Sequence, residues 1–215
     1  MGTRGAIGFI ADEKEYITYN HFDSYPDGLG NDVLNFLNTT KLTADVMKER
    51  VKELKMINDR EDEPSDEDIK KCMVAETIDT GVSEQSFQDW YCLLRKAQGN
   101  LGKYLEVGIM ADNHDFLLDS LFCEWAYIIN LDTNTLEVYR GFNKNPNGKG
   151  RYASKFMEYD HRETVEYYGV TLVAEIDLFN LPKAFGEYYN EDDDSYSLKL
   201  IYDEEWKNEE ITLDE

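Results

Sequence analysis

The chain has 215 residues, with 45 acidic residues against 22 Lys and Arg, and its formal net charge is −23 at pH 7. A negative field of this size repels phosphate backbones and anionic lipids, which argues against direct nucleic-acid binding and against a membrane partner. Hydrophobic residues make up 41% and aromatic residues 13%, which favours a packed core over a disordered chain. The charge would attract a basic protein partner or cations, although it could also serve solubility alone.

The three cysteines, Cys72, Cys92 and Cys123, are odd in number and far apart in the chain. They include no Cys-x-x-Cys pair, so their spacing supports neither a zinc site nor a disulfide framework, and we predict no cofactor. No segment resembles a signal peptide or approaches the run of about 18 apolar residues that a membrane span needs. These features favour a reducing compartment, and we expect a cytoplasmic protein.

Two short apolar runs near the start of the chain predict a β-hairpin. Residues 5–10 and 15–20 are rich in β-branched and aromatic residues and flank a short polar stretch. Gly5 and Gly8 fall inside the first run, where glycine indicates the close approach of another backbone or a ligand. A turn-rich connection, 21–30, then leads into a helical part of the chain.

Apolar stripes at helical spacing dominate residues 31–98 and predict four helices. Thr43 and Ser65 carry hydroxyl groups that can cap a helix N-terminus, and each precedes such a stripe. Ser83 is a third candidate cap, for a helix that would end before Gly99. We expect this helical segment to be inserted between two groups of strands.

Beyond the helical segment the pattern changes to that of strands. Four runs have the expected composition, and the turn between the second and third predicts a hairpin. The predicted strands cover residues 105–110, 122–130, 136–142 and 167–177. A short helix over 178–185 is expected to follow the last of them.

Together these patterns predict an α+β fold, with an N-terminal β-hairpin, a central helical segment and then antiparallel strands in a mixed or antiparallel sheet. Residues 1–190 would form a single domain, with the helical insertion at about 31–98. Residues 191–215 are dense in charge and predict an acidic C-terminal tail, in which 196–202 could add an edge strand.

Two groups of residues resemble a protein family. The chain opens with Met-Gly-Thr-Arg-Gly, and residues 19–30 contain the cluster His-Phe-Asp-Ser-Tyr-Pro-Asp-Gly-Leu-Gly. Later, residues 124–127 (Glu-Trp-Ala-Tyr) and 138–141 (Val-Tyr-Arg-Gly) also fit the pattern. These residues resemble uncharacterised proteins of phages, bacteria and fungi, which open with a Thr-Arg strand followed by an aromatic, Asp, Tyr-Pro and Gly cluster. The resemblance implies a shared fold and carries no activity with it.

The polar N-terminal motif is the strongest candidate for a site. His21 and Asp23 lie two residues apart and would face the same side of an extended chain, while Arg4 could pair with Asp23. The alternative is a hydrogen-bonded turn that orders the first helix. A catalytic hypothesis is an N-terminal-nucleophile-like hydrolase, in which cleavage before Thr3 exposes an amine that serves as the base for its hydroxyl. Arg4, His21 or Asp23 would then be supporting groups.

The charge pattern favours a different function, a non-catalytic protein that binds a basic partner. Acidic residues concentrate near 59–68 and 191–215, and carboxylates at phosphate-like spacing could mimic nucleic acid, as in phage-type inhibitors. The binding residues predicted on this basis are Asp23, Tyr25, Asp62, Glu63, Asp192, Asp193 and Asp194. A scaffold role, with tyrosines at an oligomer interface, is a third possibility. We favour the acidic binding protein, because its charge is a property of the whole chain.

Overall fold

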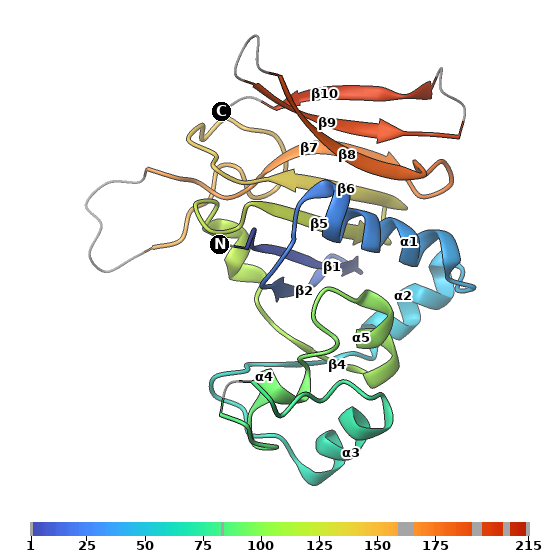
Figure 1. The fold of residues 1–215 in the computed structure, drawn as a ribbon, viewed down its shortest axis with the longest axis vertical. Helices are drawn as coiled ribbons and strands as arrows, with labels where there is room; N and C mark the ends of the chain where they lie inside the picture. Colours follow the sequence, from blue (N-terminus) through green and yellow to red (C-terminus); the bar gives the residue numbers. More distant parts are fainter. Residues whose placement is uncertain (1, 83, 159–165, 191–194, 204–206, 214–215) are drawn as a thin grey trace.

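A five-stranded mixed sheet lies at the centre of the molecule, in the strand order β2-β1-β5-β6-β7 (Figure 1). The computed structural model describes residues 2–82, 84–158, 166–190, 195–203 and 207–213. The strands of the sheet are β1 (Gly5–Ala11), β2 (Lys14–Asn20), β5 (Trp125–Asn130), β6 (Thr135–Arg140) and β7 (Thr171–Asp177). Strand β1 runs antiparallel to β2 and parallel to β5, while β5 and β6 form an antiparallel hairpin. The predicted α+β fold and both predicted hairpins are confirmed.

Five helices accompany the sheets in the described part of the chain. They are α1 (Asn31–Thr39), α2 (Ala44–Lys52), α3 (Asp66–Val74), α4 (Trp90–Leu93) and α5 (Leu101–Val107). Shorter elements are β3 (Lys55–Ile57), β4 (Ile109–Ala111), the π-helical turn η1 (Pro26–Gly30) and the 3-10 helix η2 (His114–Leu118). As predicted, Thr43 caps α2, and Ser65 caps α3 in a reciprocal capping box with Asp68.

In the middle of the chain one predicted helix is shorter than expected, and part of one predicted strand is helical. The predicted cap Ser83 lies outside the described residues, and within 84–98 the chain forms only the short helix α4. Residues 105–107 of the strand predicted over 105–110 belong to α5, because Tyr104 and Val107 bury one helical stripe in the core, whereas residues 109 and 110 do lie in a strand, β4. Gly108 ends this helix with φ 71, and β4 then pairs in parallel with β3.

A second sheet of three antiparallel strands packs on the same core as the helices. Its order is β10-β9-β8, and its strands are β8 (Ala184–Asn190), β9 (Ser195–Ile201) and β10 (Glu209–Leu213). Strand β9 is therefore central rather than an edge strand, and β10 lies in the stretch that we expected to be a tail. The helix predicted over 178–185 is wrong, because the backbone from Ala184 onward pairs with β9.

Both faces of the central sheet are buried. Trp125, Tyr127 and Ile129 of β5 face the cluster shared with the helices and the second sheet, whereas Ala126 and Ile128 face a smaller cluster on the opposite side. Strand β1 fits between β2 and β5 because its glycines have no side chain and let the backbones of these strands come close. A Cβ atom on Gly5 would lie 2.4 Å from the carbonyl oxygen of Trp125, as the sequence led us to expect. No helix within the described residues is long and apolar enough to cross a membrane.

The β1–β2 turn contains two residues in the left-handed region, Asp12 (φ 51) and Glu13 (φ 63). Turns of this kind favour Asn-Gly, since most other side chains cost energy at positive φ. The Asp132 carboxylate supports the turn by accepting hydrogen bonds from the amides of Asp12 and Glu13, both at 2.8 Å. Lys48 adds ion pairs to Asp12 at 2.8 Å and to Asp132 at 2.7 Å.

Replacing Glu13 with glycine is expected to raise the free energy of unfolding by about 1 kcal/mol, because glycine adopts this conformation without steric cost. Urea denaturation measures the change. Glu13→Ala is the control, since alanine removes the same carboxylate but keeps a Cβ atom. Equal stability of the two variants would show that the backbone conformation is not the cause.

Asp132 is expected to make the stability depend on pH in the acid range. Burial alone would raise the pKa of Asp132, but hydrogen bonds from Lys48 and from the two turn amides outweigh it and lower the pKa below 3.8. A lowered folded-state pKa gives stability that is present above the unfolded value and is lost as pH falls through the folded value. Acid titrations of the wild type and Asp132→Asn should therefore converge below about pH 3.8, and parallel curves would contradict this.

Candidate functional site

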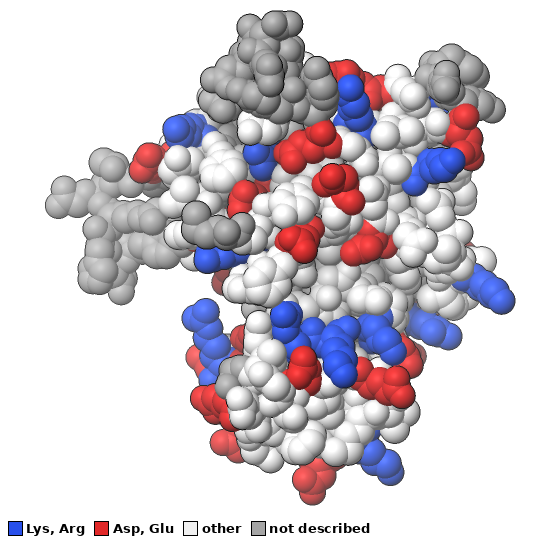
Figure 2. Space-filling view, in the orientation of Figure 1, with Lys and Arg blue, Asp and Glu red and all other residues white. Residues whose placement is uncertain are grey.

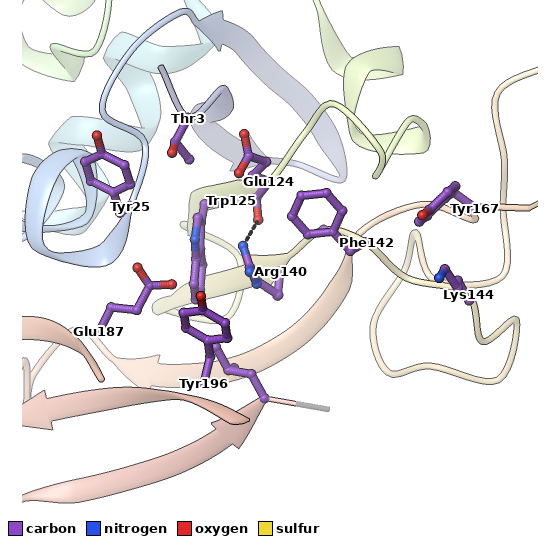
Figure 3. A pocket seen from close by; sticks show the side chains of 12 residues that line it. Thr3, Tyr25, Glu124, Trp125, Arg140, Phe142, Lys144, Tyr167, Glu187 and Tyr196 are labelled. Atoms are coloured by element: carbon purple, nitrogen blue, oxygen red, sulfur yellow. Dashed lines mark hydrogen bonds between the residues drawn. The ribbon is translucent and has the colours of Figure 1, made fainter. Parts of the chain in front are cut away.

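A cavity of about 510 Å³ opens where the end of the central sheet meets the second sheet (Figure 3). Its volume lies in the range of small-molecule binding sites, about 300–1,000 Å³. Its walls combine aromatic rings with two charges of each sign. The lining residues are Thr3, Tyr25, Glu124, Trp125, Arg140, Gly141, Phe142, Lys144, Tyr167, Glu187, Tyr196 and Leu213.

Arg140 is held between aromatic rings at this site. Trp125 and Arg140 are direct cross-strand partners on β5 and β6, so their side chains lie on the same face of the sheet. The guanidinium carbon lies 4.8 Å from the ring centre of Trp125 and 5.1 Å from that of Phe142, and Figure 3 shows it between them. Nη1 donates to the carbonyl oxygen of Glu124 at 3.3 Å. Arg140 forms no ion pair with any described residue, so donors remain for a ligand.

The chain bends sharply directly after Arg140. A Cβ atom on Gly141 would lie 2.1 Å from the carbonyl oxygen of Cys123 and 2.6 Å from that of Ser120, so only glycine fits. Phe142 then adopts φ 56, a left-handed conformation that costs a bulky residue roughly 1–2 kcal/mol. Its amide donates to the Ser120 carbonyl at 2.7 Å, which helps to hold it. This strained backbone places the Phe142 ring beside the guanidinium, and strain of this kind concentrates at functional sites.

Glu187 reaches the cavity from β8 of the second sheet. Its side chain is partly buried, and it has no hydrogen bond or ion pair with a described residue. Burial raises the pKa of Glu187, Arg140 acts in the opposite direction, and the carboxylates of Asp27 and Glu124 add to the rise. Glu187 is therefore attracted by Arg140 and repelled by two carboxylates, of which only Glu124 lines this cavity.

Gly30, the last residue of the N-terminal motif, and the adjoining Asn31 hold β8 in place, and β8 carries Glu187. Asn31 accepts a hydrogen bond from the Phe185 amide at 2.7 Å and donates to the Phe185 carbonyl at 3.2 Å. Gly30 allows a close approach, since a Cβ atom there would lie 2.9 Å from the rings of both Phe185 and Tyr127. These two rings stack at 6.2 Å. Glu187 follows two residues after this attachment.

Of the predicted site residues, Thr3 and Tyr25 line the cavity. The Tyr25 hydroxyl donates to Asp23 Oδ1 at 2.9 Å. The hydrogen bond and charge of Asp23 raise the pKa of Tyr25, so this hydroxyl is neutral near pH 7 and is a poor base for Thr3. Tyr25 therefore connects this cavity to Asp23 of the turn.

Arg4 and His21 do not join this group. The Arg4 guanidinium lies 5.5 Å from the ring centre of Phe122, and the predicted ion pair with Asp23 does not form. His21 Nδ1 lies 2.6 Å from the Tyr19 hydroxyl oxygen. Asp23 has φ 52, so the chain is not extended there, as the prediction for His21 and Asp23 required.

The hydrogen bonds of the motif are those of an ordered turn. The fully buried Ser24 accepts from Asn20 Nδ2 at 2.9 Å through its hydroxyl and from the Tyr127 hydroxyl at 3.1 Å through its carbonyl. The Leu29 amide donates to the Asp23 carbonyl at 2.9 Å. This geometry agrees with the alternative that the motif orders the first helix.

The other predicted binding residues lie away from the cavity. Asp62 and Glu63 are exposed beside α3 and α4, and Trp90 Nε1 donates to the Asp62 carbonyl at 2.8 Å. Asp192, Asp193 and Asp194 lie outside the described residues. No cluster of three or more His, Cys, Asp and Glu suited to a metal occurs in the described part of the chain.

A second, more open cavity of about 800 Å³ separates the η1–α1 region from the segment before α5. Its lining includes Asp27 and Asp32 on one wall and Arg95 and Lys96 on the other. Figure 2 shows acidic side chains above this hollow and a row of basic side chains below it. Since the two walls carry opposite charge, this cavity does not select one sign of ligand.

Sequence reasoning missed Arg140, Trp125 and Glu187 as site residues. A signal for the first two was present, because residues 124–127 and 138–141 carried the resemblance described above and both line the cavity. Glu187 gave no signal, since its place depends on the second sheet. No protein-family model matches the chain, and no curated protein or solved structure matches it either. The resemblance to phage, bacterial and fungal proteins therefore stays a prediction.

Proposed function

We propose that this chain is a non-catalytic binding protein that engages a basic partner through the aromatic cavity. The observation that carries the proposal is Glu187, a partly buried carboxylate with no partner among the described residues, facing that cavity. A buried charge without a partner is costly, so a cation that enters from outside gains more here than at an exposed carboxylate.

The surroundings of Glu187 favour a cationic side chain. Arg140 attracts its charge without forming an ion pair, while Asp27 and Glu124 repel it, and a Lys or Arg of the partner in contact with Glu187 would relieve that repulsion. The ring of Tyr25 at the same cavity offers a face that attracts cations. The net charge of −23 adds long-range steering of a basic surface. If the partner binds nucleic acid through that surface, this protein would act as its inhibitor.

A second candidate function is hydrolysis with Thr3 as the nucleophile. It is favoured by one observation, the position of Thr3 at the cavity. The mechanism needs removal of the two preceding residues, because the free amine of Thr3 must act as the base. Intact-mass spectrometry of the native protein decides it: a chain that still carries Met1 or Gly2 rules the mechanism out.

The binding proposal is tested by pull-down with the intact protein as bait. A basic partner should be retained at low salt and released at high salt, and Glu187→Gln should weaken retention about tenfold. Glu84→Gln is the matched control, because it removes the same charge from an exposed loop residue. Equal retention by Glu187→Gln and the wild type, or retention that is indifferent to salt, would contradict the proposal.

A further inference from the structure

We infer that the cavity binds the C-terminal residue of a basic polypeptide, with its carboxylate on Arg140 and its cationic side chain on Glu187. The inference rests on the proposed function and specifies which part of the partner enters. It follows from two unpaired charges of opposite sign that face one cavity without contacting each other. Figure 3 shows Trp125 between them, so a ligand that satisfies both must extend across this ring.

Arg140 provides a site for a carboxylate. A guanidinium has five N–H donors in a fixed fork that matches a carboxylate, and the described structure uses Nη1 for the Glu124 carbonyl. The flanking rings of Trp125 and Phe142 restrict the guanidinium, so less freedom is lost when a ligand binds. Because the partners of Arg140 are a carbonyl and two rings, its positive charge is not neutralised by contact.

The charges of the cavity favour a carboxylate over a phosphate group. Glu124 and Glu187 both act on Arg140, and they would repel a doubly charged anion more strongly than a single carboxylate. A C-terminal Lys or Arg carries its own cation and can place it against Glu187, which turns that repulsion into attraction. The cavity of about 510 Å³ suits a single residue with its adjoining backbone.

Isothermal titration calorimetry with three peptides tests this inference on the full chain. The peptides are acetyl-Gly-Gly-Lys with a free carboxylate, the same peptide as a C-terminal amide, and the free acid with norleucine in place of lysine. The first should bind about tenfold more tightly than either of the others, since each of these lacks one charge. Equal affinity for the acid and the amide would overturn the inference, as would an absence of binding by the lysine acid.

Two variants assign the charges to residues. Arg140→Lys keeps the positive charge but loses the fork, and it should reduce the preference for acid over amide. Glu187→Gln should abolish the preference for lysine over norleucine and leave the preference for the acid. Arg50→Lys, on the exposed face of α2, is the control and should change neither ratio. A fold defect would weaken all peptides together, whereas the inference requires that one ratio changes.

The outcomes separate this inference from the proposed function. One outcome is that acid and amide peptides bind equally while Glu187→Gln still weakens the salt-sensitive retention of the partner. In that case the proposed function is upheld, and the inference that the partner's C-terminus enters the cavity is wrong. If no lysine peptide binds and Glu187→Gln has no effect in the pull-down, both are wrong.

Discussion

Replacing Arg151 with methionine is expected to lower the free energy of unfolding by about 3 kcal/mol, because it leaves a buried carboxylate without its counter-charge. That carboxylate belongs to Glu137, which is 3% exposed. Glu137 forms an ion pair with Arg151 and accepts hydrogen bonds from Asn130 Nδ2 at 2.7 Å and from the Tyr139 hydroxyl at 2.6 Å. The two remaining bonds satisfy its oxygen atoms but do not neutralise its charge. Urea denaturation near neutral pH measures the loss.

A double variant tests this explanation. Adding Glu137→Gln to Arg151→Met removes the buried charge while keeping an oxygen that can accept hydrogen bonds, so much of the lost stability should return. Arg60→Met, at an exposed position, should change the stability by less than about 0.5 kcal/mol. If the double variant is no more stable than the single one, the charge is not the cause.

Replacing Gly141 with alanine is expected to destabilise the protein by about 3 kcal/mol, as overpacking against rigid groups does. The atoms that a Cβ would meet, at 2.1 Å and 2.6 Å, are the backbone oxygens of Cys123 and Ser120. Backbone oxygens in a hydrogen-bonded bend cannot turn away as a flexible side chain could. Because Gly141 joins Arg140 to Phe142, relaxation around the new atom should also separate the guanidinium from the Phe142 ring.

Gly186→Ala provides the control for this variant. A Cβ atom at Gly186 would meet its nearest neighbours at 3.7 Å, an ordinary contact distance, although the residue also lies near the cavity in β8. Its stability should change by less than about 1 kcal/mol. Thermal unfolding of both variants measures the difference, and similar melting temperatures would mean that the bend after Arg140 tolerates a side chain.

The parts of the fold that depend on neighbouring residues could be predicted from the sequence. The two hairpins follow from alternating apolar runs joined by short polar turns, and the caps Thr43 and Ser65 follow from a hydroxyl side chain before an apolar stripe. The glycines of β1 indicated a close neighbour, and the structure supplies the Trp125 carbonyl next to Gly5. In each case the interaction that decides the structure lies within a few residues or leaves a constraint on residue size.

Tertiary structure alone decided the remaining elements and the site. The apolar residues of 105–110 and 178–185 fit a helix and a strand equally well. Burial of the helical stripe that includes Tyr104 makes the start of the first run helical, and pairing of β8 with β9 makes the end of the second run a strand. The parallel pairing of β1 with β5 joins residues 120 positions apart, such as Gly5 and Trp125, and no local pattern encodes it. The sequence by itself determined the acidity, the fold class and the local elements. The packing of the two sheets decides which charges lie unpaired at the cavity, because burial and the distance between charges are properties of the folded chain.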